Sequence, residues 1–371
     1  MKIVSVTNRK MMKAFVNFPK ILYRDDPFWV PPMWNEEKKA YSGKTNVILQ
    51  NNEYVLLLVY EKERLLGRSL VYIDKDFNRY YSSTIGFFGA FECFDNPTAA
   101  KLLFSTSIAW LKERGMSAIR GPIHPVAESW GFLLKGYDSL PVLMASYNPP
   151  YYHKLIKEAG FKKIKDLLAY EADINTGYKI PERIVRFSKQ LIEHHPELTV
   201  RKINKKNLME EATSIWKITN TSLGANWGYV PVEESVMKDM VRRLKIILDE
   251  EAIWFVQDRG VPVGFALGFP DPNAIIKGIG GRLFPTGFIS LLYRRKRIRR
   301  YRLFALGVLP QYHGMGLDVL LYKHLNDALV AKKVLIEANY ILEDNWNIRN
   351  ALEKLGMKRT KEYRIYEKSI L

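Results

Sequence analysis

Hydrophobic and polar positions along this chain form two similar series. Positions 54–60 and 65–71 are apolar runs of strand length joined by a charged turn, and positions 252–257 and 263–267 repeat that arrangement. Each hairpin pattern is preceded by a strand pattern and a helical spacing, at 3–6 and 10–23 in the first series and at 199–203 and 207–221 in the second. The pattern predicts an α+β chain in which one arrangement occurs twice.

Two spacings indicate an internal duplication. Nearly the same number of positions separates Gly67 from Gly264, within the hairpins, and Gly160 from Gly356, near the end of each series. After the second glycine pair, two lysines, a tyrosine and a glutamate recur at matching positions. An amphipathic helix pattern at 181–195 separates the series. We therefore expect a domain at 1–175, a helical connector at 176–197 and a second domain at 198–371.

A glycine-bearing turn in the second series carries the clearest chemical signal. The apolar segment 303–309 ends at Pro310, and 317–331 has the spacing of a helix, so Gln311 to Gly316 connect a strand to a helix. Glycines let the backbone approach a ligand closely, and the first helical turn offers unpaired N–H groups and a positive dipole end. The turn is therefore a candidate diphosphate cradle, although an ordinary strand-to-helix turn has the same appearance.

The pattern Gln311-x-x-Gly314-x-Gly316 after a strand resembles the pyrophosphate loop of the GNAT superfamily of acyl-CoA-dependent N-acyltransferases. A second motif of that superfamily is similar to the helix that Asn345 opens and Gly356 closes, which precedes a last strand at 363–366. The resemblance implies tandem GNAT-like domains, each a mixed, mostly antiparallel sheet flanked by helices. It also implies acetyl-CoA or another acyl-CoA as donor, bound by Leu306, Gly307, Val308, Gln311, Tyr312, His313, Gly314, Met315, Gly316, Leu317 and Asn345.

The first series lacks the cradle. Its central strand pattern, 85–91, is followed by Glu92 and Asp95 in a turn without the two glycines, and carboxylates repel a diphosphate. We expect the first domain to be a degenerate copy that binds no CoA. If Gly89 and Gly307 both mark the central strand, the first domain has extra residues after that strand and the second has them before it.

Acyl transfer to an amine needs groups that carry protons, and these are poorly marked. The tyrosine that GNAT members often place four residues before the helix-closing glycine is Leu352 here, and the central strand lacks an acid. Glu337 is the candidate base, and Tyr363 and Tyr366 are the candidate acids, beside Tyr340. Pairing with a basic side chain for Glu337, and core packing for the tyrosines, are the structural alternatives.

The connection between the first two helices borders the acceptor site in many GNAT members. Here it is the loop at 223–231 with the helix end before it. The resemblance therefore implies that Asn220, Asn226, Trp227 and Tyr229 bind the acceptor. A buried structural loop explains the same residues equally well.

Composition limits the cellular compartment and the kinds of partner that we expect for this chain. The 371 residues are 47% hydrophobic, with one cysteine, Cys93, and without an apolar run long enough for a membrane span or a signal peptide, so we expect a cytoplasmic protein in a reducing compartment. The formal net charge is +18, and seven of the nine residues at 294–302 are basic. This block suits CoA phosphates, RNA or anionic lipid, or is a solvated surface. Zinc-ligand spacing is absent, and Cys93 is expected to pack in the core.

The expected function is acyl-CoA-dependent N-acylation, with acetyl or a longer acyl group passing to a small-molecule or peptide amine at a site in the second domain. A Fem-type transferase, which takes aminoacyl-tRNA as donor and also pairs two GNAT-like domains, would explain the basic block. A CoA-binding protein without catalysis would explain the missing acid and base. The sequence leaves open whether the two domains pair within one chain or across a homodimer.

Overall fold

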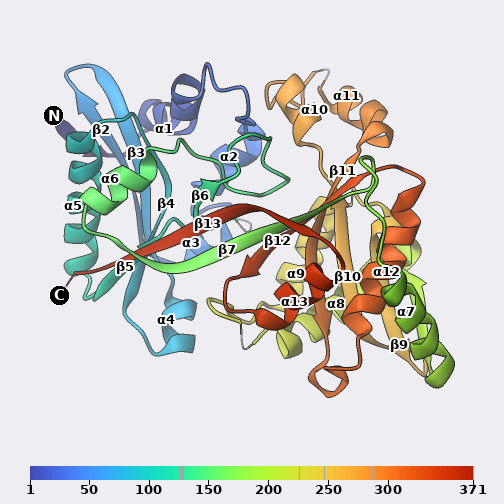
Figure 1. The fold of residues 1–371 in the computed structure, drawn as a ribbon. Coiled ribbons are helices and arrows are strands. Elements are labelled where there is room, and N and C mark those ends of the chain that lie inside the picture. Colours follow the sequence, from blue (N-terminus) through green and yellow to red (C-terminus); the bar gives the residue numbers. More distant parts are fainter. Residues whose placement is uncertain (126–128, 225, 246, 286, 371) are drawn as a thin grey trace. The chain divides into compact units, whose positions relative to one another are not determined.

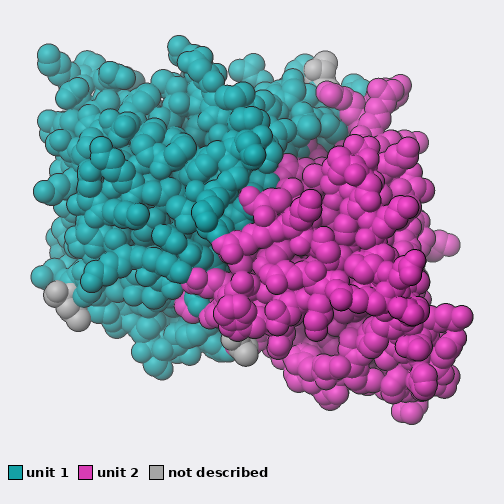
Figure 2. Space-filling view, viewed as in Figure 1, with its two compact units in different colours: residues 1–167, 273–291, 361–371 teal, residues 168–272, 292–360 magenta. Residues whose placement is uncertain are grey.

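The computed structural model describes residues 1–125, 129–224, 226–245, 247–285 and 287–370, and the side chain of Arg243 is not among those described. Ala225, inside the predicted acceptor-side loop, lies outside these ranges. Two compact units make up the chain (Figure 2): unit 1 holds 1–167, 273–291 and 361–371, and unit 2 holds 168–272 and 292–360. The predicted division into 1–175, 176–197 and 198–371 stays a prediction.

Unit 1 is built on a mixed sheet with the strand order β1-β2-β3-β4-β5-β13 (Figure 1). Neighbouring strands are antiparallel except β4 and β5, which are parallel, and β6 pairs with β13. The strands are β1 (Lys2–Ser5), β2 (Tyr54–Glu61), β3 (Arg64–Ile73), β4 (Ile85–Cys93), β5 (Ala118–Gly121), β6 (Phe132–Lys135) and β13 (Lys358–Ser369). The helices are α1 (Arg9–Leu22), α2 (Trp34–Ala40), α3 (Val47–Asn51), α4 (Lys75–Tyr81), α5 (Pro97–Lys112), α6 (Tyr152–Glu158) and α10 (Asn273–Gly278).

Helices α1 and α5 cover opposite faces of this sheet. Successive strand residues point to opposite faces. On β3, Gly67 lies against Leu103 of α5, whereas the next residue, Arg68, bonds the carbonyl of Phe15 on α1. The α5 face holds the larger apolar core, with the rings of Phe88 and Phe104 packed 5.4 Å apart.

Unit 2 repeats the plan with the strand order β7-β12-β11-β10-β9-β8. Strands β8 to β11 are antiparallel to one another, and β12 pairs with β11 in parallel. The strands are β7 (Lys162–Asp173), β8 (Leu198–Lys202), β9 (Ile253–Asp258), β10 (Val261–Pro270), β11 (Arg300–Val308) and β12 (Leu335–Leu342). The helices are α7 (Glu182–His194), α8 (Leu208–Ser222), α9 (Glu234–Leu244), α12 (Leu317–Val330) and α13 (Trp346–Lys354), with short 3-10 turns η1 (Lys205–Asn207), η2 (Glu250–Ala252), η3 (Arg295–Arg297) and η4 (Pro310–Tyr312). Helix α11 (Gly287–Arg294) crosses the boundary between the units, and so do β7, whose residues 162–167 belong to unit 1, and β13, whose residues 358–360 belong to unit 2.

The two faces of the unit 2 sheet are covered in the same way. On β10, Leu267 faces α8 and α9, while the next residue, Gly268, lies against Leu325 of α12. Helix α7, which covers the predicted helix at 181–195, packs on α12. The α8 side of the sheet is therefore separate from the α12 side, and β11 forms part of both faces.

Strand registers confirm the duplicated α+β fold. Gly67 is opposite Val59 in the first hairpin, and Gly264 is opposite Val256 in the second. The central strand of each unit also carries one extra residue near the middle of its pairing, opposite Ser69 in unit 1 and between the partners of Leu267 and Gly268 in unit 2. Such a bulge bends a strand away from its neighbour.

Gly89 and Gly307 both lie on a central strand, β4 and β11, as predicted, but they take different positions in the register. Arg68 is opposite Glu92 in unit 1, and Phe265 is opposite Gly307 in unit 2, so Glu92 takes the place of Gly307. Glycine is required at position 89 for a different reason: a Cβ there would overlap the carbonyl oxygen of Ile123. Glu92 therefore lies within β4, and of the two predicted turn acids only Asp95 is in the turn.

The last strand of each series contributes to the opposite unit. In unit 1, positions 366–369 of β13 pair with β5. In unit 2, β7 is the neighbour of β12, and the N–H of Ile174, just after β7, donates to the carbonyl of Val334 at 2.9 Å. Each sheet is thus completed by a strand from the other half of the sequence.

Candidate active site in unit 2

The turn before α12 forms an open helix N-terminus. Gly314 and Gly316 have φ of 82° and 84°, in the left-handed region that glycine adopts at little cost. Gly316 is the residue at the N-cap, and in the described chain no side chain accepts a hydrogen bond from the first turn of the helix. A Cβ on Gly314 would have no described atom within 4 Å. The first N–H groups of α12 are therefore free to bind an anion.

The corresponding helix of unit 1 is closed by its own residues. The Asn96 side chain caps α5 by accepting a hydrogen bond from the Ala99 N–H at 2.9 Å. Pro97, the first helical residue, has no N–H to offer. Exposed Asp95 adds a negative charge beside this end. The difference favours the prediction that unit 1 does not hold a diphosphate.

Strand β11 has one free edge next to the cradle. Its pairing with β12 covers positions 300–303, whereas its pairing with β10 continues to Val308. Among the described residues, Ala305 to Val308 thus have a strand partner on one side only. The predicted donor contacts Leu306 and Gly307 lie on this segment, whose free edge can accept an extended ligand that carries amide groups. In unit 1 the position that corresponds to Val308 is Cys93, whose N–H donates to the Tyr152 hydroxyl and whose carbonyl accepts from the Tyr151 hydroxyl, each at 2.8 Å. The edge is therefore occupied there.

The side chains of the cradle mostly bind the protein itself. Tyr312 donates from its hydroxyl to the Asp258 carboxylate at 2.7 Å, and this hydrogen bond raises the pKa of Tyr312. A ring nitrogen of His313 lies 2.9 Å from the Val308 carbonyl oxygen. Gln311 is exposed. The N–H groups of Tyr312, His313 and Met315 also donate to carbonyls of the turn itself. Within the predicted cradle, the N–H groups of Gly314, Gly316 and Leu317 are therefore better placed than the side chains to hold a ligand.

Asn345 begins α13 as its N-cap. The side-chain oxygen accepts from the Ile348 N–H at 3.2 Å, which leaves its amide nitrogen as the group able to reach a cofactor. Leu352 on the same helix is 5% exposed and points into the core, at the position where many GNAT members have a tyrosine.

On the predicted acceptor side, Asn220 organises the loop that follows α8. Its side-chain oxygen accepts from the hydroxyl of Tyr229 and from the Val232 N–H, and its amide donates to the Val232 carbonyl at 2.9 Å. These contacts favour a structural role for Asn220 and Tyr229. Asn226 and Trp227, both half-buried, remain the acceptor-side candidates of this loop.

Ser222 is a site residue that sequence reasoning missed. It is the last residue of α8, and its Oγ would lie 3.0 Å from a Cβ built on Gly307. That oxygen is buried and has no hydrogen-bond partner among the residues that the structure describes. A hydroxyl left in this state next to the free edge of β11 is available to a ligand. No sequence motif marked it, because serine at a helix end is common.

Glu337, the predicted base, is fully buried in an internal ion pair. It is 0% exposed and binds the Arg300 guanidinium, and the Asn339 amide donates to it at 2.8 Å. In the β11–β12 ladder it is opposite Arg302, five strand positions from Gly307, which is about 16 Å at the usual rise per residue. This position favours the alternative in which Glu337 pairs with a basic side chain.

The predicted acids Tyr363 and Tyr366 belong to unit 1, because they lie on the exchanged strand β13. There the Tyr366 hydroxyl lies 2.8 Å from Nδ1 of His153, and Tyr363 is 0% exposed. The exchange places Tyr170 of β7 in unit 2 instead, where its hydroxyl donates to Glu353 of α13 at 3.0 Å. Two similar strand ends could not show which sheet each would complete.

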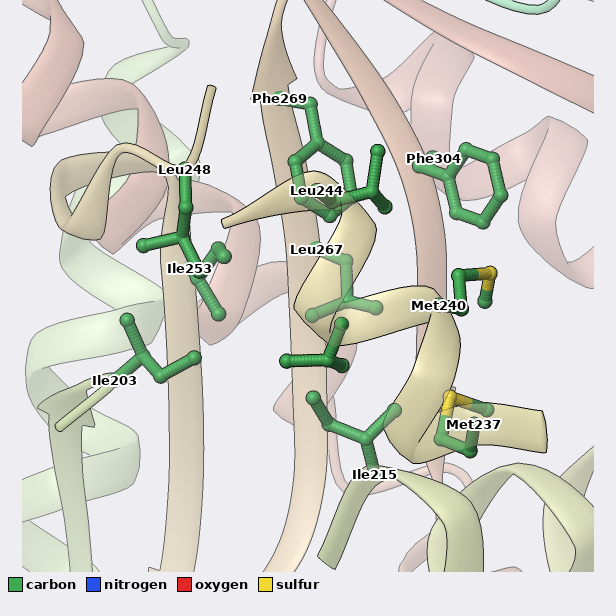
Figure 3. Close-up of a pocket in the computed structure, with 11 residues that line it drawn as sticks. Ile203, Ile215, Met237, Met240, Leu244, Leu248, Ile253, Leu267, Phe269 and Phe304 are labelled. Atoms are coloured by element: carbon green, nitrogen blue, oxygen red, sulfur yellow. The ribbon is translucent and has the colours of Figure 1, made fainter. Parts of the chain in front are cut away.

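An apolar cavity of about 20 Å³ lies on the α8 side of the same sheet (Figure 3). Side chains from α8, from α9, from strands β9 to β11 and from the segments that follow β8 and α9 converge on it, and all of them are hydrophobic: Ile203, Ile215, Met237, Met240, Val241, Leu244, Leu248, Ile253, Leu267, Phe269 and Phe304. Phe304 is the extra residue of the bulge in β11. The cavity therefore begins next to the free edge of β11, and its flexible methionines can adapt to an apolar group.

Unit 1 holds a buried acidic network that the sequence did not reveal. The hydroxyls of Tyr23 and Tyr152 each donate to Oε2 of Glu92 at 2.7 Å, and Arg68 lies 4.0 Å from Oε1. Burial raises the pKa of Glu92 to about 7, against the opposing effect of Arg68. Glu92 was expected in a turn, and its actual place within β4 explains why its partners could not be foreseen.

Comparison with known proteins gives two curated relatives, while no protein-family model matches the chain. Protein YghO of Escherichia coli is 31% identical over 98% of this chain and 94% of its own length. The bacterial ceramide synthase of Caulobacter vibrioides is 28% identical over 100% of this chain and 98% of its own length.

Among solved structures, a tandem GNAT protein from the clavulanic acid biosynthesis pathway aligns with a TM-score of 0.56 at 9% identity, over 100% of this chain and 98% of that one. A GCN5-related N-acetyltransferase from Sphaerobacter thermophilus aligns with a TM-score of 0.55 at 12% identity, over 99% and 96%. At such low identity these two matches bear on the fold alone.

Proposed function

Because this chain belongs to the same family as protein YghO and has the fold of tandem GNAT proteins, we propose that it is an acyl-CoA-dependent N-acyltransferase with one donor site, in unit 2. The donor is an acyl-CoA, and the acceptor is an amine. Catalysis takes place at the free edge of β11, between the α12 cradle and the end of α8.

One observation carries the proposal: the contrast between the two helix N-termini. In unit 2 the turn at Gly314 and Gly316 leaves the first N–H groups of α12 without a described side-chain cap, beside a free strand edge. In unit 1 Asn96 caps α5, and the Tyr151 and Tyr152 hydroxyls occupy the strand edge at Cys93. The diphosphate of CoA suits the first arrangement and finds no open donors in the second.

Ser222 is the proposed proton relay of the reaction. The amine nitrogen attacks the thioester carbonyl carbon, the carbon–sulfur bond then breaks, and the amine proton must finally reach the thiolate. The Oγ of Ser222 lies next to Gly307 and has no competing partner among the described residues. It can accept a hydrogen bond from the amine and return a proton toward the sulfur.

The acyl chain of the donor is proposed to enter the cavity beside Phe304. Phe304 is three strand positions from Gly307, about 10 Å, so an aliphatic chain attached at the thioester would reach it. The lining is apolar throughout, which favours an aliphatic group over a polar one. At about 20 Å³ the cavity has to widen around its flexible Met237 and Met240 side chains before a chain longer than acetyl enters it. The name of the Caulobacter relative, a ceramide synthase, supports a lipid amide as the class of product.

Calorimetric titration of acetyl-CoA and dodecanoyl-CoA tests the donor site. The wild type should bind both compounds, and Gly314→Glu should bind neither, because the carboxylate would lie where the diphosphate is held. Asp95→Lys, which removes the acid at the corresponding turn of unit 1, is the matched control and should bind as the wild type does. If the wild type bound no acyl-CoA, the proposal would be abandoned, and aminoacyl-tRNA would be the next donor to test.

Release of the CoA thiol in the presence of an amine panel tests turnover. A thiol reagent can follow it, because burial raises the pKa of the single cysteine, Cys93, to about 12 and protects it in the folded protein. Val241→Phe, which fills the cavity, should slow the dodecanoyl donor at least ten-fold and leave the acetyl donor unchanged. Val236→Phe on the exposed face of α9 is the control. Binding without turnover of any donor would leave a CoA-binding protein without catalysis.

A further inference from the structure

The basic block of the sequence has two different parts in the structure. Arg302 is 0% exposed, and Arg300 pairs with Glu337 inside unit 2. The preceding basic side chains are exposed and follow α11: Arg294, Arg295, Lys296, Arg297 and Arg299. Reading all seven as one solvated surface is therefore wrong, since strand β11 carries two of them into the interior. The five exposed ones remain without a role in the site described above.

Helix α11 presents an apolar face beside these charges. Ile289, Leu292 and Tyr293 are 67%, 37% and 73% exposed. They are three and four positions apart, so they lie on one side of the helix, whereas Gly287 and Leu291 are buried on the other. Because α11 is one continuous helix, the spacing of these residues along it is enough to place the exposed and the buried ones on opposite faces. Phe284, shortly before the helix, is 74% exposed.

The charge around α11 has one sign. No aspartate or glutamate occurs between Asp271 and Asp318, so the exposed basic residues face no acid from their own segment. A patch that is apolar and strongly basic fits a partner with an anionic surface and an apolar interior. Protein–nucleic acid interfaces are more polar and would leave Ile289 and Leu292 without a suitable contact. Tyr293 has the amphipathic ring that favours the boundary between headgroups and acyl chains.

We propose that α11 and the η3 turn after it dock this protein on anionic lipid bilayers. The side chains of Ile289, Leu292 and Tyr293 enter the headgroup–acyl boundary, and the five exposed basic residues bind lipid headgroups. No helix in the described ranges is long and apolar enough to cross a bilayer, so the docking is peripheral. This inference does not depend on the proposed transferase activity.

Sedimentation of the full chain with vesicles tests the proposal. We expect binding to phosphatidylcholine vesicles that contain about one third phosphatidylglycerol, weak binding to pure phosphatidylcholine, and loss of binding between about 0.1 M and 0.5 M salt. Arg294→Gln/Arg295→Gln/Lys296→Gln/Arg297→Gln should lower affinity at least a hundred-fold, at roughly five-fold for each basic residue. Ile289→Ser/Leu292→Ser/Tyr293→Ser should also reduce binding while the salt dependence remains.

A control variant that loses the same number of charges elsewhere shows whether binding depends on the position of the charges at α11 or only on the net charge of the protein. Lys101→Gln/Lys112→Gln/Lys154→Gln/Lys157→Gln removes four exposed charges from α5 and α6 and should bind vesicles as the wild type does. Leu292→Cys, labelled with an environment-sensitive dye, should shift to the blue on anionic vesicles, and buried Cys93 escapes the label. Equal loss in the control variant, an unshifted dye, or binding of tRNA in place of vesicles at the same salt would each overturn the proposal.

Discussion

The ring of Phe187 on α7 packs directly against the α-carbon of Gly316, the residue at which α12 begins. A Cβ added to Gly316 would overlap the edge of that ring. Helix α7 thus closes one side of the cradle turn, and two separate constraints require glycine there: the positive φ and the close approach of an aromatic ring. Gly314, two residues earlier, has the positive φ alone.

Alanine substitutions at Gly314 and Gly316 should therefore lower the free energy of unfolding by different amounts. Gly314→Ala should lower the free energy of unfolding by about 1 kcal/mol, from backbone strain. Gly316→Ala should cost about 1–3 kcal/mol more, from the contact with Phe187. In a Phe187→Ala background that extra cost should disappear, as measured by urea unfolding. Equal costs for the two glycines in both backgrounds would show that Phe187 does not constrain the turn.

Ser222→Ala should separate activity from stability. Turnover should fall by about 10²–10⁴-fold, the usual range for a lost proton carrier. The free energy of unfolding should stay the same or rise, because the substitution removes a buried hydroxyl that has no described partner. Thr221→Ala, which loses only an exposed hydrogen bond to Lys217, is the control and should keep full turnover. A Ser222→Ala enzyme with normal turnover would assign that serine to packing.

Substitution of Glu337 should be costly for the fold. Removing one member of a buried ion pair leaves the other charge uncompensated and typically costs about 3–5 kcal/mol. Because Asp271 also lies within 4.0 Å of Arg300, we expect Glu337→Ala to cost about 3 kcal/mol in urea unfolding. The double change Arg300→Met/Glu337→Leu should recover part of that loss. A Glu337→Gln protein of normal stability that has lost turnover would instead restore Glu337 as the catalytic base.

The pKa of Glu92 predicts a pH dependence of stability. Its folded value of about 7 lies above its ordinary value of 4.5, so the unfolded chain ionises this group first. The contribution of Glu92 is therefore fully present below about pH 4.5 and is lost as the pH rises to about 7. Relative to Glu92→Gln, the wild type should lose at most about 3 kcal/mol of unfolding free energy over that interval.

Urea unfolding of both proteins at several pH values checks the prediction for Glu92. Asp95→Asn, in the exposed turn that follows β4, is the matched control and should show no comparable trend. Parallel curves for the wild type and Glu92→Gln would mean that Tyr23, Tyr152 and Arg68 hold the carboxylate ionised at all these pH values.

Much of the fold was accessible from local patterns. The apolar spacing predicted both hairpins, and the structure has them at β2–β3 and β9–β10 in equivalent registers. The cradle could be predicted because its chemistry is local: a strand end, two glycines and a helix start within a few residues. Ser222 could not, since its importance arises from contact with Gly307, far away in the sequence.

Pairings between distant strands account for the remaining errors. Glu92 was assigned to a turn, because the apolar run that predicted the central strand ends at Phe91, whereas pairing with β3 extends β4 to Cys93. Glu337 was chosen as an acid near the site, and only the β11–β12 ladder reveals Arg300 beside it. Such pairings depend on the sheet as a whole and leave no mark in any short segment.

The exchanged last strands have a consequence for synthesis on the ribosome. Unit 1 includes positions 361–371, so its sheet cannot be completed while those residues are still inside the ribosomal tunnel. The first half must then wait, with the edge of β5 unpaired, while the second half is translated. If the two halves arose by duplication, this exchange made them depend on each other. A deletion or transfer of one half of the gene would remove a strand from the sheet of the other half.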